Sequence, residues 1–393
     1  MEEMTFKKIL PTSENRPLSQ IRRELKIKWY RCPIDPKCPI DPKELRKLSK
    51  PSDSKGICMA LGHLSLWSLT GISCFFFASQ QLWIAFIFTL FFHGTIGTFF
   101  TAPHHELCHG TVFKTKRLNG FFLRIFATLG MLNFHIYKLS HSYHHRFTLH
   151  NGADKEVVLP KPPSLNLFYL LQLFTFNFTG GFESRGFIPT LKGHIRVAFN
   201  QMETPFNDWG EELYKEDPEE CLKAVNWARF ILGFHIVSSV AFISIGHPIL
   251  ILVISAHIFI GNWLRYFVGA PMHCGLRSDV ADFRKCVRTI TLNPVSEFLY
   301  WNMNWHLEHH MFAAVPCYNL KKLHKTVARD MPKPRTLIES WVEMRNVWKR
   351  QQNDPEYAFD TPVPEGNLNN KKKQHEYLKS SIGDLAPSTI ILS

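Results

Sequence analysis

The sequence predicts an all-α integral membrane protein in which four transmembrane helices form two hairpins and a helical cap lies on the cytosolic side. Two observations favour this fold. The 393-residue chain contains two long stretches without any Asp, Glu, Lys or Arg, residues 57–100 and 230–264. The chain also has 20 histidines, and many of them are clustered in the polar segments beyond these stretches.

Each uncharged stretch is too long for a single membrane-spanning helix. A helix crosses the bilayer core with about 20 apolar residues, so each stretch is expected to contain two helices joined by a tight turn. The turns are predicted at residues 80–81 and 246–248, where the chain reads Gln-Gln and Gly-His-Pro. The four spans are therefore expected at residues 57–79, 82–100, 225–245 and 248–268.

The distribution of basic residues predicts the orientation in the membrane. The chain has 46 Lys and Arg against 33 Asp and Glu, a formal net charge of +13, and these charges lie outside the two uncharged stretches. Positively charged loops stay on the cytosolic side, so both hairpins are expected to enter from the cytosol, leaving both termini and the middle segment there. Because this topology accounts for the charge and no recognition motif is present, no nucleic acid partner is expected.

Three regions are expected along the chain. Residues 1–56 are polar and basic, lack the pattern of a cleavable signal peptide, and are predicted to be a cytosolic N-terminal segment. Residues 57–350 form the predicted membrane domain, which ends in a helix near 336–352. Residues 351–393 are expected to be a polar, disordered tail.

Two shorter apolar stretches lie between the hairpins. Residues 119–134 are interrupted by Arg124, and residues 165–178 are interrupted by Gln172. They contain 16 and 14 residues, fewer than a span of about 20 requires. Both are therefore predicted to be helices that lie in the membrane interface.

The segment HHELCHG at 104–110 contains the spacing H-E-x-x-H, from His105 to His109. Residues i and i+4 lie on one face of a helix, so these two histidines could hold a zinc ion with Glu106 beside them as general base. His104 offers an alternative spacing to His109, and helix geometry favours His105. Taken alone, the motif indicates an intramembrane zinc metalloprotease.

Two further histidine groups share the pattern H-x-x-H-H. They are HSYHH, with His141, His144 and His145, and HLEHH, with His306, His309 and His310. Because residues i, i+3 and i+4 share a helix face, each motif is expected to present three imidazoles together. With the first motif this makes eight candidate ligands, whereas a catalytic zinc ion takes three from the protein. Two metal ions are the simpler explanation, and imidazole suits iron, zinc and copper.

The motifs HHELCH, HSYHH and HLEHH around two helical hairpins resemble the histidine boxes of the membrane fatty acid desaturase and hydroxylase superfamily of di-iron enzymes. The resemblance covers roughly residues 57–350. Residues 275–324 are most similar to the branch that includes rhizopine oxygenase-like and DesA-type proteins, which carries a further histidine after the last hairpin. The sequence PMHCG places His273 there, although Met272 and Cys274 depart from the usual Gln-His-Thr-Gly context.

The resemblance implies two ferrous ions, O2 as co-substrate and nine metal ligands. These ligands are His105, His109, His141, His144, His145, His273, His306, His309 and His310. Electrons are expected from a separate donor of the cytochrome b5 or ferredoxin type, because the chain has no His-Pro-Gly-Gly haem-binding signature and no flavin or ferredoxin motif. The resemblance thus predicts an O2-dependent fatty acyl desaturase that introduces a C=C bond. Hydroxylation of a lipid or small metabolite on the same site is the alternative, and the zinc metalloprotease is a remote one.

Further polar residues lie in or near the histidine boxes, and other histidines lie elsewhere in the chain. Glu106 and Glu308 lie inside the boxes and could orient ligand N–H groups, and Asn302 and Asn304 could hydrogen-bond near the metals. His324 is expected to be an ordinary loop or surface residue. Ionisable residues inside membrane spans are often functional, but a neutral histidine bonded to a neighbouring helix explains each histidine inside the predicted spans as well: His63, His93, His235 and His257. The membrane would be the endoplasmic reticulum in a eukaryote or the inner membrane in a bacterium.

Overall fold

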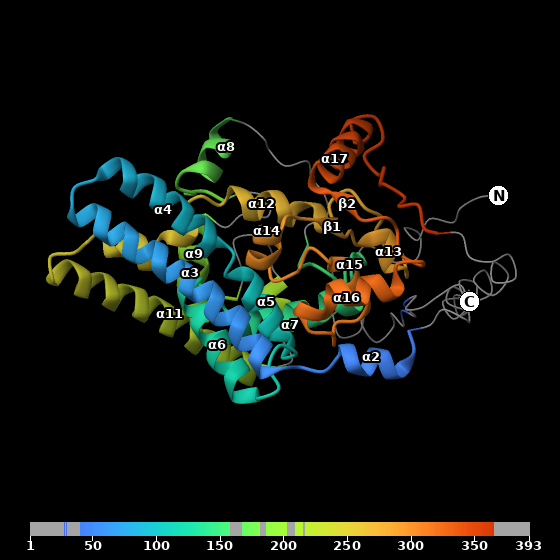
Figure 1. The fold of residues 1–393 in the computed structure, drawn as a ribbon, viewed down its shortest axis with the longest axis horizontal. Helices are drawn as coiled ribbons and strands as arrows, with labels where there is room; N and C mark the ends of the chain where they lie inside the picture. The colour runs from blue at the N-terminus through green and yellow to red at the C-terminus, as the bar shows by residue number, and fades with distance from the viewer. Residues whose placement is uncertain are drawn as a thin grey trace, which may run out of the picture.

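The computed structural model describes Ile27, Trp29 and residues 40–157, 167–180, 186–202, 209–214 and 217–364. Most of the predicted N-terminal segment, and the predicted tail beyond residue 364, lie outside these residues. The described part of the chain is mostly helical, as the sequence predicted. Long helices extend towards one side of the molecule, and shorter helices and loops make up the other side (Figure 1).

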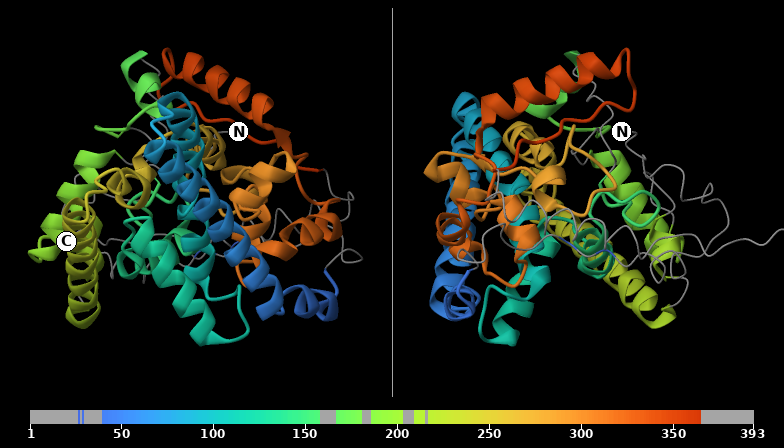
Figure 2. Two further views of the ribbon diagram at one scale, coloured as in Figure 1. Left: turned by 60° about the vertical axis from the view of Figure 1, so that its left-hand side comes forward. Right: turned by 90° about the vertical axis from the view of Figure 1, so that its right-hand side faces the viewer.

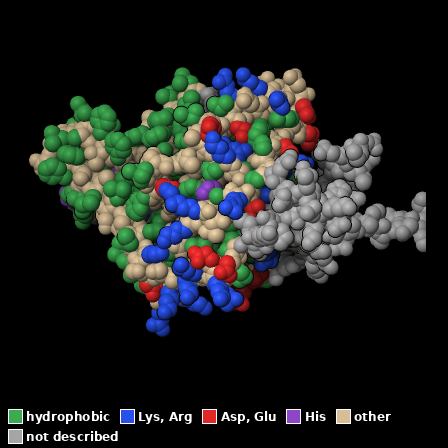
Figure 3. Space-filling view, turned by 45° about the vertical axis from the view of Figure 1, so that its right-hand side comes forward, with side chains coloured by type: hydrophobic (Ala, Val, Ile, Leu, Met, Phe, Trp, Pro, Cys, Tyr) green, Lys and Arg blue, Asp and Glu red, His purple; other side chains and the backbone are tan. Residues whose placement is uncertain are grey.

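Three helices in the described part of the chain are long and apolar enough to cross a membrane. They are α3 (Asp53–Ser79), the helix Trp83–His109 that α4 (Trp83–Thr98) and α5 (Thr101–His109) form together, and α11 (Pro218–Ser244). Each contains 27 residues, about 40 Å at 1.5 Å per residue, which exceeds a bilayer core of about 30 Å. The end of the molecule formed by these helices displays hydrophobic side chains, whereas Lys, Arg, Asp and Glu gather elsewhere on the face shown in Figure 3.

The helix that leads into the first histidine box is interrupted between α4 and α5. Pro103 has no backbone N–H, and its ring would meet the carbonyl four residues earlier in a regular α-helix. The backbone forms a tighter turn here, in which the Ala102 N–H donates to the Phe99 carbonyl at 2.8 Å. Gly110 then ends α5 with φ 70°, a left-handed conformation that glycine adopts readily. Pro103 and Gly110 therefore determine where the short helix that carries His105 and His109 begins and ends.

The fourth predicted span, residues 248–268, is broken and does not form one continuous helix. It consists of a π-helical turn (Ile251–Ser255), a 3-10 turn (His257–Phe259) and α12 (Trp263–Gly269). At its centre it packs so closely on α4 that a Cβ on Gly94 would meet the backbone of Ile260. The expectation of a regular helix here is therefore corrected, and the crossing of the membrane by this segment stays a prediction.

The backbone of the broken segment finds hydrogen-bond partners in the chain that follows α8 (Leu167–Phe174). The Asn177 N–H donates to the Phe259 carbonyl at 2.7 Å, and the Gly261 N–H donates to the Thr175 carbonyl at 3.0 Å. Irregular backbone is tolerated at membrane depth only where protein or water satisfies its polar groups. Residues 175–177 satisfy two of these groups.

The two shorter apolar stretches form helices. They are α6 (Lys116–Leu129) and α8, and α9 (Phe187–Ala198) follows them. Phe121 on α6 and Leu167, Phe168 and Leu171 on α8 are exposed. The helices are confirmed, and their position in the membrane interface stays a prediction.

Most of the remaining described helices lie on the other side of the molecule from the ends of the long ones (Figure 1). The remaining helices are α2 (Pro42–Leu48), α7 (Phe134–Phe147), α10 (Trp209–Tyr214), the 3-10 turn η4 (Ala270–Met272), α13 (Phe283–Cys286), α14 (Pro294–Leu299), α15 (His306–Met311), α16 (Cys317–Val327) and α17 (Leu337–Gln351). Strands β1 (Ile290–Thr291) and β2 (Arg335–Thr336) pair in parallel, with Ile290 opposite Arg335. A reciprocal cap between Thr336 and Glu339 opens α17, the helix predicted near 336–352. Figure 2 shows α17 along one side of the molecule in both views.

Candidate metal centre

Three short helices and one loop present the nine predicted histidines. α5 carries two of them, the last two turns of α7 carry three, and α15 carries three within 6 residues. His273 follows the 3-10 turn η4. The side chain of Asn133 caps α7 by accepting the Ile136 N–H at 3.3 Å, so the register of the second box is fixed from its first turn.

The structure brings all nine histidines together in two groups. The five-histidine group contains His105, His109, His141, His145 and His309, and the four-histidine group contains His144, His273, His306 and His310. Within each group one ring nitrogen of every histidine lies within 4.8 Å of those of the others. His104 belongs to neither group, and its ring packs 4.8 Å from that of Tyr137.

Each H-x-x-H-H motif is divided between the two groups, so a single motif does not present three imidazoles to one metal. In α7, His141 and His145 enter the five-histidine group while His144 enters the other. In α15, His306 and His310 stay together while His309 crosses over. At 3.6 residues per turn, residues i and i+4 point about 40° apart, whereas i+3 and i+4 point about 100° apart. The two histidines of each i, i+4 pair therefore belong to the same group, and the histidine at i+3 belongs to the other group.

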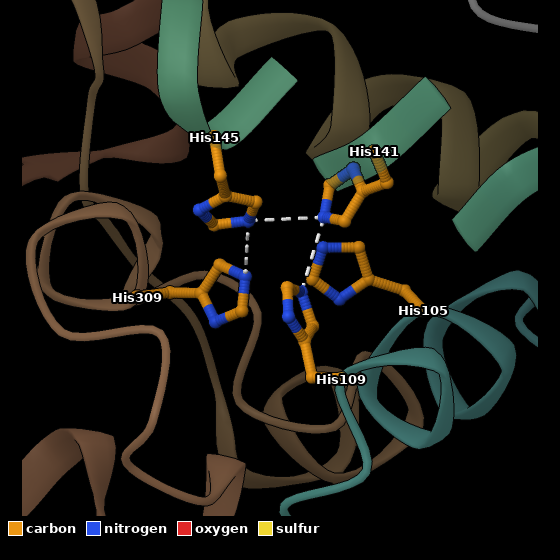
Figure 4. Close-up of side chains that lie close together, drawn as sticks. All are labelled: His105, His109, His141, His145 and His309. Atoms are coloured by element: carbon orange, nitrogen blue, oxygen red, sulfur yellow. Dashed lines mark hydrogen bonds between the residues drawn. The ribbon is translucent and has the colours of Figure 1, made fainter. Parts of the chain in front are cut away.

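The rings of the five-histidine group converge on a common centre (Figure 4). The Nε2 atom of His141 lies 3.1 Å from that of His109 and 3.0 Å from that of His145. His309 Nε2 lies 3.1 Å from His145 Nε2. The ring of His105 lies 4.4 Å from that of His141, between centroids, and its buried Nε2 has no hydrogen-bond partner among the described residues.

The four-histidine group has the same spacing. His306 Nε2 lies 3.0 Å from His273 Nε2 and 3.2 Å from His310 Nε2, and the ring of His144 lies 4.8 Å from that of His310. The two groups touch where the rings of His145 and His310 stack at 4.3 Å. Two metal ions bound here would be close neighbours.

In four of the histidines, Nδ1 points away from the other rings and lies within hydrogen-bond distance of a carboxylate or carbonyl oxygen. In the five-histidine group, His105 Nδ1 lies 2.9 Å from Glu106 Oε1, and His141 Nδ1 lies 2.6 Å from Glu156 Oε1. In the other, His144 Nδ1 lies 2.8 Å from Asp154 Oδ2, and His273 Nδ1 donates to the Cys286 carbonyl at 3.0 Å. A neutral imidazole carries one proton, so a histidine that donates from Nδ1 has an unprotonated Nε2.

The inward lone pairs fit a bound metal ion. Lone pairs that face each other at about 3 Å repel unless a cation lies between them. Metal–imidazole bonds are about 2.1 Å long, so two ligand nitrogens at a right angle around one metal are about 3.0 Å apart. The observed separations of 3.0 to 3.2 Å match this spacing. An outer N–H donated to a carboxylate or carbonyl is the usual partner of a metal-bound histidine.

Burial keeps these imidazoles neutral. It lowers the pKa of His273 to about 3. For five other ligands, burial first and repulsion from neighbouring imidazoles second hold the pKa well below its ordinary range: His141, His145, His306, His309 and His310. Metals bind the unprotonated imidazole, so the ligand form is the stable form near neutral pH.

A buried arginine holds the loop around His273. The Arg288 guanidinium donates to the carbonyls of Pro271 and Cys274, on either side of the histidine, and its backbone N–H donates to the Met272 carbonyl. Its charge is balanced by Glu343 on α17, at 3.0 Å from the Arg288 Nε. Sequence reasoning missed this role of Arg288, since the arginine lies 15 residues beyond the histidine it positions.

The contacts of the polar residues around the histidine boxes agree only in part with the predictions from the sequence. Glu106 contacts His105 as expected. Glu308 instead accepts from the Thr289 hydroxyl at 2.6 Å and lies 2.6 Å from His324 Nδ1, and it contacts no ligand ring in the described part of the chain. His324 is therefore a partner of the third box and not an ordinary surface residue. Asn304 donates to the Ile290 carbonyl. The carboxylates of Asp154 and Glu156 were missed, because no spacing rule links them to the second box.

Three of the four histidines inside the predicted spans bond to neighbouring segments. His93 lies 2.9 Å from both the Thr70 hydroxyl and the Val253 carbonyl. His235 lies 2.9 Å from the Ser255 hydroxyl, and His63 lies 3.2 Å from the Ile96 carbonyl. His257 differs, since its Nδ1 bonds to the Ile254 carbonyl within its own broken segment.

Comparison with known families agrees with this geometry. The family model described as fatty acid desaturase matches residues 81–341, about two thirds of the chain. The matched region contains all nine histidines of the two groups. No match to a curated protein is found. The chain belongs to the fatty acid desaturase family.

Proposed function

We propose that the protein is an O2-dependent membrane di-iron oxidoreductase that desaturates a fatty acyl chain. The five-histidine group would hold one iron ion and the four-histidine group the other. The observation that carries this proposal is the convergence of neutral imidazoles in two touching groups within a member of this family. Imidazole is a good ligand for ferrous iron, and the ring spacing fits a metal in each group.

Iron bound in these groups would supply the activation of O2 and the removal of hydrogen from an unactivated C–H bond. In the overall reaction O2 takes four electrons, two from the C–H bonds of the substrate and two from an external donor, and leaves as two molecules of water. Glu156, Asp154 and the Cys286 carbonyl each hold one ring in a single tautomer and orientation. These rings are His141, His144 and His273, in that order. Seven of the nine ligand side chains are buried, and His109 and His145 are half-buried, so most of the site is shielded from bulk water.

The proposal includes partners and a location. The long helices would lie in a lipid bilayer, with the site and both termini on the cytosolic side. A separate electron-transfer protein of the cytochrome b5 or ferredoxin type would deliver the electrons. The membrane would be the endoplasmic reticulum in a eukaryotic cell or the inner membrane in a bacterium. The substrate would be a fatty acyl chain or, for the alternative below, a small metabolite.

Two alternatives are less well supported. A zinc metalloprotease needs three protein ligands on one metal, which would leave most of the two histidine groups without a purpose. Its general base would be Glu106, whose Oε1 atom instead lies 2.9 Å from His105 Nδ1. Hydroxylation needs the same ligands as desaturation and differs only in whether oxygen is transferred to the substrate.

Product analysis tests the proposal. The protein is expressed in a host that supplies redox partners, and lipids and metabolites are compared by mass with a control host. Loss of two hydrogens supports desaturation, and gain of one oxygen atom supports hydroxylation. His144→Ala and His309→Ala, one from each group, should abolish the product, while His247→Ala at an exposed turn should not. A product that persists in both ligand variants would overturn the assignment.

A further inference from the structure

A buried histidine of α3, His63, bonds to two segments that are distant in the sequence. The indole N–H of Trp301 donates to His63 Nδ1 at 3.1 Å. An indole nitrogen can only donate, so His63 Nδ1 is unprotonated and the ring proton lies on Nε2. His63 Nε2 therefore donates to the Ile96 carbonyl at 3.2 Å. One neutral imidazole thus joins α3 to α4 and to the chain that leads into α15.

The Ile96 carbonyl lies where α4 gives way to the helix of the first histidine box. The last turn of α4 is tightened here, since the Phe99 N–H donates to the Ile96 carbonyl at 3.2 Å and the Phe100 N–H donates to the Gly97 carbonyl at 3.0 Å. In a regular α-helix the Phe100 N–H would donate to the Ile96 carbonyl. His63 supplies that carbonyl with a second donor, at the point where the chain turns into α5.

Trp301 occupies a position that glycine usually holds at the end of a helix. It follows the last turn of α14 with φ 50°, and Asn302 after it has φ 57°. The Asn302 N–H donates to the Glu297 carbonyl at 2.9 Å and closes the helix. The left-handed conformation is unfavourable for a bulky residue, so it persists only where the surrounding structure imposes it. The buried bond from Trp301 to His63 is such a constraint.

The left-handed pair Trp301 and Asn302 leads directly into the third histidine box. The Trp305 N–H donates to the Asn302 carbonyl at 3.0 Å, and the His309 N–H donates to the Trp305 carbonyl at 3.1 Å. Backbone hydrogen bonds therefore connect this pair to His309. His309 is the third-box histidine that belongs to the five-histidine group, where its ring lies 4.6 Å from that of His105, between centroids.

We propose that His63 is a positioning residue for the five-histidine group. By bonding to both Ile96 and Trp301, it fixes the helix of the first box relative to His309 of the third box. The five-histidine group combines these two boxes, whereas the four-histidine group contains no histidine of the first box. The inference rests on the proposed function and deepens it, because it identifies a residue of a long helix that orders the metal centre.

Cobalt titration tests the proposal without electrons or turnover. Imidazole sites bind Co²⁺ as well as Fe²⁺, and the visible absorption of bound Co²⁺ depends on the number and arrangement of its ligands. The full chain in lipid nanodiscs should bind two Co²⁺ ions. His63→Leu should weaken the binding of one of them about fivefold, which corresponds to one neutral hydrogen bond of about 1 kcal/mol, and change the absorption of that ion. His63→Gln keeps a donor and an acceptor and should restore both.

A milder variant and a matched control accompany this titration. Trp301→Phe removes the indole N–H and keeps an aromatic ring, so the protein should fold and the cobalt absorption should change in the same direction. The double variant should bind Co²⁺ no more weakly than His63→Leu alone, because both changes remove the same bond. His93→Leu is the control, since His93 is equally buried in the first hairpin but contacts Thr70 and Val253. It should leave cobalt binding and absorption unchanged.

The outcomes separate this inference from the proposed function. Wild-type cobalt binding and absorption in both His63→Leu and Trp301→Phe would overturn the positioning role. The same change of absorption in His93→Leu would also overturn it, because the effect would then come from a general loss of helix packing. Cobalt binding that depends on His63, in a protein that forms no oxidised product, would support the positioning role and contradict the proposed function alone.

Discussion

Asp154→Asn is expected to weaken metal binding by the four-histidine group. Asp154 Oδ2 accepts from His144 Nδ1 at 2.8 Å and from the Leu149 N–H at 2.9 Å, and its Oδ1 accepts from the Glu156 N–H at 3.0 Å. Asparagine has one oxygen instead of two. Whichever way its amide turns, an NH2 group faces a donor, and at least one hydrogen bond is lost.

Two independent estimates of the size of this effect agree. A hydrogen bond to a charged group contributes about 1.5 to 3 kcal/mol. Removing the partner of a metal-bound histidine typically weakens metal affinity about 10- to 100-fold, which is about 1.4 to 2.8 kcal/mol. The variant should therefore retain the fold and lose about one to two orders of magnitude in iron affinity at one of the two groups.

The assay is iron retention by the purified protein during titration with a chelator. Asp279→Asn is the matched control, because this half-buried aspartate accepts from Asn151 at 2.9 and 2.7 Å and contacts no metal-ligand histidine in the described residues. Its φ of 55° is one that asparagine adopts readily. If Asp154→Asn kept both irons at the wild-type chelator concentration, the role assigned to this carboxylate would be refuted.

Three further results are expected. Glu308→Gln should lower the free energy of unfolding by about 1 to 3 kcal/mol, measured by denaturant titration, because it weakens the buried contact with His324; an unchanged midpoint would contradict this. Gly94→Ala should lower the free energy of unfolding by about 1 to 3 kcal/mol, because its Cβ would meet the backbone of the broken segment. Gly233 has open space around it, so Gly233→Ala should leave the free energy of unfolding unchanged or raise it. Metal removal by a chelator should lower the melting temperature, since a ligand at 100 times its Kd stabilises by about 2.7 kcal/mol. Restored iron should restore that temperature, and a melting curve indifferent to iron would count against metal binding.

The histidine boxes could be found from the sequence because their geometry is local. Residues i and i+4 share a helix face whatever the rest of the fold does, so the pairs His105/His109, His141/His145 and His306/His310 could be paired before the structure was known. The first three candidate spans were equally accessible, since long uncharged stretches predict apolar helices. His273 required the family resemblance, because it stands alone in the sequence.

Contacts between distant segments could not be predicted. The division of each H-x-x-H-H motif depends on how α7 and α15 are rotated against each other, which no spacing encodes. The same holds for Arg288, which acts through the carbonyls around His273, and for His324, which meets Glu308 from the next helix. The broken fourth segment has the apolar composition of a regular span, and its close packing on Gly94 is a contact between distant segments that the composition does not encode.

The most direct test of the central proposal is the metal content of the purified protein. Reconstitution with ferrous iron followed by elemental analysis should give two irons per chain. A double variant, His306→Ala with His310→Ala, removes the i, i+4 pair of the four-histidine group and should leave one, whereas His247→Ala should leave two. One zinc ion per chain, or an iron content that the double variant does not change, would contradict the proposal that two iron ions occupy the two histidine groups.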